Sequence, residues 1–430
     1  MARFVADLTP LRASPEFRRI YAGQLVSFLG TQITVVAVPV QVYAMTRSSL
    51  AVGLVGAAEL VPLLIGSLAG GSIVDSRDRR MLMLAMQVCL AFCTTALAVN
   101  ATIDRPRLWP LYVFPAMAAL FSGVDRPARG ATLPRLVGAD MLPAANALWQ
   151  ILISVGTVVG PSLAGLLILR SSLATVFWVD VATFAIAFVA IAGLPPLPPE
   201  GGGTKAGLGS IAEGLRFLRG RRLLQSTFLI DLDAMVFGLP RALFPAIAAT
   251  LYGGGPGTVG LLYAAIGAGS MVGATTSGWV GTVRRQGRAV VIAVTVWGAA
   301  MAAFGVVRWL PLGLLLLATA GAADVISAVF RNTILQSRVP DAMRGRMASV
   351  HIAVVTGGPR LGDVEAGVAA TLIGVQAAVV TGGLACLVGV VAVARWFPEL
   401  MRHDRIERDP SMPGLPHPPG AEPSELPPDP

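Results

Sequence analysis

Long apolar stretches, separated by short polar segments, follow one another along almost the whole chain. Each stretch has about 20 residues or more, the length of α-helix that crosses the hydrocarbon core of a bilayer. A segment in lipid must satisfy its own backbone hydrogen bonds, so these stretches are predicted to be helical. The pattern predicts twelve transmembrane helices, at residues 20–45, 51–73, 81–101, 108–124, 144–169, 174–194, 223–251, 258–280, 289–307, 310–330, 347–373 and 377–396.

Proline and glycine interrupt the pattern after the sixth predicted helix, at residues 195–203. Proline cannot continue a helix, so this segment separates two sets of six helices. Within it, residues 210–222 have the amphipathic pattern of a surface helix. The predicted organisation is a cytoplasmic amino-terminal segment (1–19), a six-helix half (20–194), a cytoplasmic linker (195–222), a second six-helix half (223–397) and a disordered, proline-rich cytoplasmic tail (398–430).

Composition supports an all-α integral membrane protein. Hydrophobic residues make up 54% of the 430 residues and charged residues 13%, whereas roughly 25% of residues are charged in soluble domains. The mean hydropathy is +0.70. Because the apolar stretches recur along the whole chain, the membrane-embedded part is the protein and not an anchor for a soluble domain.

The charge distribution sets the expected orientation. The net charge is +9, but the basic residues lie in short loops between apolar stretches, which argues against nucleic-acid binding. With both termini, the linker and alternate loops on one side, that side carries 26 basic residues and the other side five. The positive-inside rule therefore places both termini and the linker in the cytoplasm, in a protein of the cell membrane.

A charged segment between the second and third predicted helices resembles the signature loop of the major facilitator superfamily, Gly-x-x-x-Asp-Arg-x-Gly-Arg-Arg. Ser76 stands where arginine is usual, and Asp78 where glycine is usual. The resemblance implies a charge latch on the cytoplasmic face; the alternative is that these charges only set the orientation. The residues that match the signature, or that supply the missing charge, are Gly71, Asp75, Arg77, Arg79 and Arg80.

The fifth predicted helix resembles a motif of proton-coupled exporters in the same superfamily. The motif residues are Gly156, Gly160, Pro161 and Gly165. Glycines four residues apart make a flat face for close helix contact, and the proline frees a backbone carbonyl. Ordinary glycine-rich packing is the alternative.

Three further segments resemble the enterobactin exporter branch of the superfamily: residues 36–46, 260–266 and 344–346. The resemblance implies two pseudo-symmetric six-helix bundles and secondary export of a siderophore. Multidrug and macrolide pumps of the wider group are the alternative. A nutrient importer or a membrane sensor without transport is less consistent with the sequence.

Export needs an energy source. The only lysine, Lys205, lies outside any phosphate-binding loop, so ATP is not the direct source through this chain. A proton gradient is expected instead, with no cofactor. The three histidines form no catalytic or metal-binding constellation, so the chain is not expected to be an enzyme. The expected partners are a small-molecule substrate and the lipid bilayer, and the chain is expected to act as a monomer.

Ionisable residues within spans are costly in lipid and are candidate functional residues. Arg360 and Asp363 are three residues apart on one helical face, so they are expected to pair and leave Glu365 free. Asp363 is the expected proton carrier, with a static ion pair as the alternative. The candidates for proton coupling or substrate contact are Glu59, Asp180, Asp231, Asp233, Arg241, Asp324, Arg360, Asp363 and Glu365.

Overall fold

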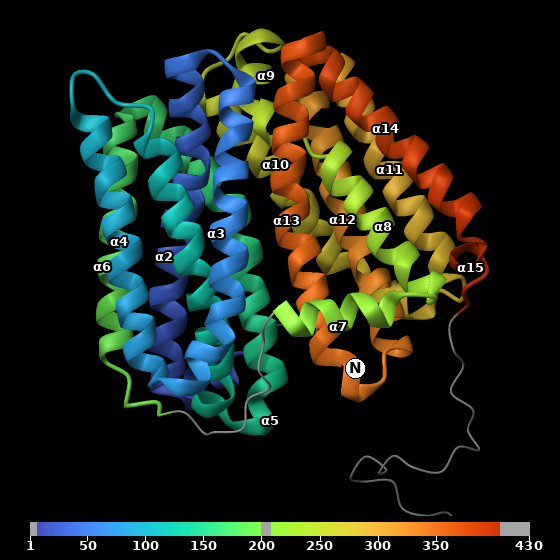
Figure 1. The fold of residues 1–430 in the computed structure, drawn as a ribbon. Helices are drawn as coiled ribbons and strands as arrows, with labels where there is room; N and C mark the ends of the chain where they lie inside the picture. Colours follow the sequence, from blue (N-terminus) through green and yellow to red (C-terminus); the bar gives the residue numbers. More distant parts are fainter. Residues whose placement is uncertain (1–6, 199–207, 405–430) are drawn as a thin grey trace, which may run out of the picture.

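The computed structural model describes residues 7–198 and 208–404, and their regular secondary structure is entirely helical (Figure 1). After the short helix α1 (Thr9–Ala13), two bundles stand side by side. The first contains α2 (Pro15–Thr46), α3 (Ser49–Ser76), α4 (Arg79–Thr102), α5 (Pro110–Arg170) and α6 (Leu173–Ala192). The second contains α8 (Arg222–Phe237), η1 (Arg241–Leu243), α9 (Phe244–Thr250), α10 (Pro256–Thr276), η2 (Ser277–Thr282), α11 (Gln286–Val306), α12 (Leu310–Arg338), α13 (Asp341–Ile373) and α14 (Val375–Trp396).

Helix α5 contains two predicted spans. It is 61 residues long and turns back at Gly138, whose φ of 73° is outside the helical range. Glycine adopts this conformation without steric cost. Ten helices of the described residues are long and apolar enough to cross a membrane when α5 counts once. With α5 counted as two crossings, and with the more highly charged α13 added at 33 residues, the arrangement agrees with the twelve predicted spans.

The two ends of the bundles are named here by the connections that they carry. The linker end carries the α3–α4 connection, Gly138 and α7 (Leu208–Leu218), which lies crosswise in the lower part of Figure 1, below α8. The far end carries the α2–α3 connection and the α5–α6 connection. Polar caps define several of these turns; the Ser48 hydroxyl, for example, accepts a hydrogen bond from the backbone N–H of Ala51 at the start of α3.

The seventh predicted span, residues 223–251, was expected to be one helix, and it is broken. Helix α8 ends at Phe237, and Pro240 precedes the short 3-10 turn η1. Proline has no backbone N–H and cannot continue the helical hydrogen-bond ladder. The break leaves the backbone N–H of Ala242 free of the regular ladder, so it can bond a side chain.

The segments outside the bundles differ from prediction. In the linker, the predicted surface helix is α7, which begins and ends earlier than expected; its Glu213 pairs with Arg346 of α13 at 2.5 Å. Residues 199–207 lie outside the described residues. Helix α2 begins at Pro15, five residues before the predicted span, because Ser14 caps it.

The start of the predicted disordered tail is folded. Helix α15 (Pro398–Met401) follows α14, and its Glu399 pairs with Arg222 of α8 at 3.0 Å. His403 is buried, and burial together with Arg338 lowers its pKa. Its neutral ring nitrogen Nδ1 can therefore accept a hydrogen bond from Arg338, 3.4 Å away. Residues 405–430 lie outside the described residues.

Candidate functional site

Glycine residues bring the two bundles into contact at the far end. A Cβ atom on Gly53 of α3 would clash with the backbone oxygen of Asp363 in α13. A Cβ atom on Gly260 of α10 would lie 2.9 Å from the Cα atom of Gly165 in α5. Two helix pairs, α3 with α13 and α5 with α10, therefore pack backbone against backbone, and Figure 1 shows α3 beside α13.

The same face of α5 is exposed toward the linker end. Thr157 contacts α10, because a Cβ atom on Gly267 would lie 2.6 Å from its backbone oxygen. Asn146 and Gln150 lie on the same helical face as Thr157, about three and two turns nearer the linker end, and both are exposed. The bundles are therefore in contact at the far end, whereas Asn146 and Gln150, on the same face of α5, are exposed nearer the linker end.

The glycine–proline motif of α5 makes two helix contacts. Gly156 and Gly160 pack on Phe28 and Gln32 of α2 within the first bundle. Pro161 lacks a backbone N–H, so the carbonyl of Thr157 has no helical partner and faces α10 of the second bundle. The helices do pack closely at this motif, and Pro161 and Gly165 are the motif residues that lie against Gly260 at the bundle contact.

A charged pair joins the bundles at the same contact. The Nη2 atom of Arg360 in α13 donates to the Oε2 atom of Glu59 in α3 at 3.0 Å, and both side chains are about three-quarters buried. Arg360 was expected to pair with Asp363 on its own helix, and this expectation is wrong. Helix α3 approaches through its glycines and brings the Glu59 carboxylate to Arg360 from the other bundle.

The break in the seventh predicted span supplies a hydrogen-bond donor to Asp363. Its Oδ1 atom accepts a hydrogen bond from the backbone N–H of Ala242 at 3.1 Å, the group that the break at Pro240 leaves available. Arg241 and Arg360 both lie close enough to act on the charge of Asp363. The Tyr263 hydroxyl donates to the backbone oxygen of Arg241 at 3.3 Å. Glu59, Arg241, Arg360 and Asp363 thus form one cluster, called here the interbundle cluster.

A second charged group lies inside the second bundle. Asp231 of α8 pairs with Arg331 of α12 at 2.7 Å, and their side chains are only 3% and 7% exposed. Asp324, one of the predicted candidates, lies 4.0 Å from Arg331. His351 shares with this pair a cavity of about 10 Å³, room for one water molecule. Asp231 is therefore part of a buried ion pair.

The other predicted acids lie apart from the interbundle cluster. Asp180 is buried in the first bundle, where the Thr34 hydroxyl donates to it at 2.6 Å. Asp233 faces α14, where a Cβ atom on Gly389 would clash with its carboxylate. Glu365 is partly buried on α13, two residues beyond Asp363.

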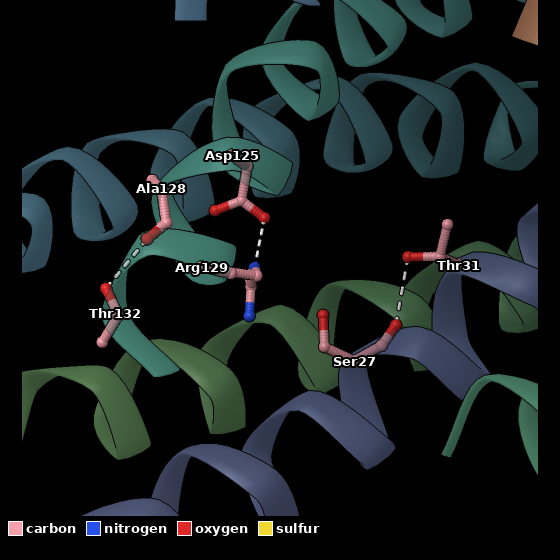
Figure 2. A network of polar contacts seen from close by, with 6 residues as sticks. All are labelled: Ser27, Thr31, Asp125, Ala128, Arg129 and Thr132. Carbon is pink, nitrogen blue, oxygen red and sulfur yellow. Dashed lines mark hydrogen bonds and ion pairs between the residues drawn. The ribbon is translucent and has the colours of Figure 1, made fainter. Parts of the chain in front are cut away.

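The sequence prediction missed three arginines inside the spans. Predicted helices four and ten end just before them, at residues 124 and 330, whereas α5 and α12 continue. Figure 2 shows the pair Asp125–Arg129, 2.5 Å apart, beside α2. Arg331 bonds Ser327 at 2.7 Å in the corresponding helix of the second bundle. Arg129 and Arg331 each have a polar residue four positions earlier, Asp125 and Ser327, and this spacing could have indicated that both arginines lie in helices. The third, Arg126, is exposed.

The comparison with protein families is decisive. The model of the transmembrane secretion effector family matches residues 5–422 of the 430-residue chain. The chain belongs to the transmembrane secretion effector family. This family is part of the major facilitator superfamily, so the chain is a multi-pass membrane transporter.

Related transporters match over almost the whole length. The enterobactin exporters EntS of Citrobacter koseri and Shigella boydii are each 28% identical over 389 residues, which is 90% of this chain and 93% of theirs. A solved peptide transporter superposes with a TM-score of 0.73 at 12% identity, covering 91% of this chain and 96% of its own. A D-xylose–proton symporter gives 0.71 at 13% identity, covering 89% and 98%. These two structures show the same fold.

The superfamily signature loop ties helices of the first bundle together. Arg79 donates to the backbone oxygen of Ala131 in α5 at 2.8 Å, and Arg80 to that of Ala192 at the end of α6 at 2.7 Å. Ala192 is the last residue of α6, so its carbonyl group has no helical partner and is available to Arg80. Arg79 and Arg80 therefore hold α4 against α5 and α6.

Asp78, a departure from the signature, has a structural role that the sequence did not indicate. It caps α4 by accepting from the backbone N–H of Met81 at 3.0 Å, and it accepts from the backbone N–H of Leu197 at 2.8 Å. Among the described residues, the side chains of Asp75 and Arg77 make no hydrogen bond or ion pair. Gly71 lies within α3. A latch through Asp75 and Arg77 stays a prediction.

Proposed function

We propose that this transporter is a secondary active exporter that moves a siderophore, or a similar medium-sized small molecule, out of the cytoplasm in exchange for protons. The EntS relatives, which match 90% of the chain, support export and this substrate class. The chain acts in the cell membrane as a monomer, uses no cofactor and takes its energy from the proton gradient. The linker end faces the cytoplasm.

The charge count supports this orientation. Arg126, Arg129 and Arg331 lie about two turns or more inside their helices, counted from Gly138 in α5 and from the end of α12, so they are not loop residues. Their removal from the count leaves 23 basic residues at the linker end against five at the far end. The excess still places the linker end in the cytoplasm. The space that opens toward the linker end is then open to the cytoplasm, where an exporter takes up its substrate.

The interbundle cluster is the observation that carries the proposal. Alternating access requires the far end to open, and that movement must separate Glu59 on α3 from Arg360 on α13, as well as α3 from Asp363. A carboxylate that loses its arginine partner within the membrane binds a proton more readily. Opening is thereby coupled to proton binding at Glu59. It also moves α3 away from Asp363, which is the proposed proton carrier because its exposure changes with the far end, while Arg241 and Arg360 stay beside it and set its charge.

The remaining acids have supporting roles in this proposal. Asp231 and Asp324, with Arg331, stabilise the second bundle beside the cluster, and Asp180 and Asp233 stabilise contacts within the two bundles. Glu365 stays available on α13 but faces away from Asp363. The signature loop, with Asp75 and Arg77, braces the cytoplasmic face when the linker end closes.

Export is testable in cells and in everted membrane vesicles. A strain without this gene, grown under iron limitation, is expected to secrete less siderophore while its tolerance to a drug panel is unchanged. Everted vesicles containing the protein are expected to accumulate that siderophore, and a protonophore should abolish the accumulation. Unchanged secretion with reduced drug tolerance would contradict the substrate assignment and favour a multidrug or macrolide pump. Accumulation that resists the protonophore would contradict proton coupling.

A further inference from the structure

Arg126 is an exposed arginine of α5. It lies on α5 next to Asp125, and it is close enough to Arg360 of the other bundle for their like charges to act on each other. Nearby Val124 packs on Gly70 of α3, eleven residues beyond Glu59 toward the linker end. Arg126 therefore faces the interbundle space on the open side of the interbundle cluster.

The other arginines of this region have acidic partners. Arg129 pairs with Asp125, Arg331 with Asp231, and Arg360 with Glu59. Arg241 makes no ion pair among the described residues, but it lies close enough to Asp363 and Asp324 for the opposite charges to attract each other.

Arg126 has no such partner. Among the described residues, its guanidinium group makes no hydrogen bond and no ion pair. Asp125 is its neighbour in the chain, but that carboxylate is bonded to Arg129. A cation without a partner inside a span is costly, and its presence marks a functional position.

We infer that Arg126 binds a negatively charged group of the substrate, so that the transported molecules are organic anions with a partly apolar body. A guanidinium group presents paired N–H donors that match the two oxygens of a carboxylate, and its fixed positive charge attracts other anionic groups as well. An anion entering from the linker end meets Arg126 first and Arg360 beyond it. The inference rests on the proposed transport direction and does not depend on proton coupling.

The test compares two dyes of one chemical scaffold and opposite charge. Full-length protein is placed in nanodiscs of zwitterionic lipid without a proton gradient, and the binding of fluorescein, an anion, and of rhodamine 123, a cation, is measured by fluorescence anisotropy. The wild-type protein is expected to bind fluorescein about tenfold more tightly or better. Arg126→Gln should remove this preference, and Arg126→Lys should keep part of it because the charge remains.

A matched control removes an arginine from the same helix outside the interbundle space. Arg170 is exposed at the far end of α5, and Arg170→Gln should keep the dye preference. Circular dichroism and size-exclusion chromatography check that each variant is folded. Absence of a fluorescein preference in the wild type, or its persistence in folded Arg126→Gln, overturns the inference. If substrate drives proton movement but the protein shows no preference for the anionic dye, this inference fails and the proposed function stands. If the protein prefers the anionic dye but substrate drives no proton movement, proton coupling fails and this inference stands.

Discussion

Gly260→Leu is expected to abolish transport by forcing the bundles apart at the far end. A Cβ atom at this position would lie 2.6 Å from the backbone oxygen of Pro161 and 2.9 Å from the Cα atom of Gly165. These neighbours are backbone atoms and cannot move aside as a side chain can. Overpacking of this kind costs about 1–3 kcal/mol, or a factor of roughly 5–150 in the equilibrium between conformations. The variant should accumulate with its far end open.

Labelling of one cysteine measures that shift. Leu60 of α3 contacts Gly357 of α13 across the bundle interface, so Leu60→Cys, in a protein without its three native cysteines, reports opening of the far end. Gly260→Leu should increase labelling by an impermeant maleimide added from outside. Gly130→Leu is the control, because nothing lies within 4 Å of a Cβ atom there. Equal labelling and equal transport in both variants would contradict the assignment of this contact as the outer gate.

Arg331→Gln is expected to cause the largest loss of stability. The substitution leaves Asp231 buried without its partner, at a site where the two side chains are 3% and 7% exposed. Breaking a buried pair costs about 3–5 kcal/mol because an uncompensated charge remains. The melting temperature of the purified protein should fall sharply, and adding Asp231→Asn to the variant should restore part of it.

An exposed ion pair provides the matched control. Arg222 and Glu399 are 3.0 Å apart, but their side chains are 53% and 42% exposed. Such pairs contribute about 0–1 kcal/mol, so Glu399→Gln, which removes the pair and leaves the other contacts of Arg222 in place, should change the melting temperature little. If Glu399→Gln and Arg331→Gln were equally destabilising, the buried pair would not be a structural element of the second bundle.

The spans could be predicted because lipid imposes a simple length and polarity rule on each of them. A close helix contact at Gly165 could also be predicted, although not which helix makes it, because small residues favour close helix packing. The ends of the fourth and tenth spans could not. Arg129 and Arg331 look like loop residues to a hydropathy pattern, and only their partners Asp125 and Asp231 let them lie inside helices.

The members of the interbundle cluster could be predicted as candidate residues, but their partners could not. Arg360 and Asp363 share a helix, and local spacing suggested that they pair. The partner of Arg360 is Glu59, 301 residues earlier in the chain, and the partner of Asp363 is a backbone N–H that exists because Pro240 breaks a span. Neither relation is encoded in local spacing, since both depend on how the bundles are placed against each other.

Proton movement driven by substrate tests the central claim most directly. Purified protein is reconstituted into proteoliposomes that contain a pH-sensitive dye, and siderophore is added without an imposed gradient. Asp363→Asn keeps the size and hydrogen-bonding capacity of the side chain but cannot exchange a proton. Glu365→Gln, two residues away on the same helix, is the control. The account predicts proton movement with the wild type and with Glu365→Gln, and none with Asp363→Asn; normal proton movement with Asp363→Asn would contradict it.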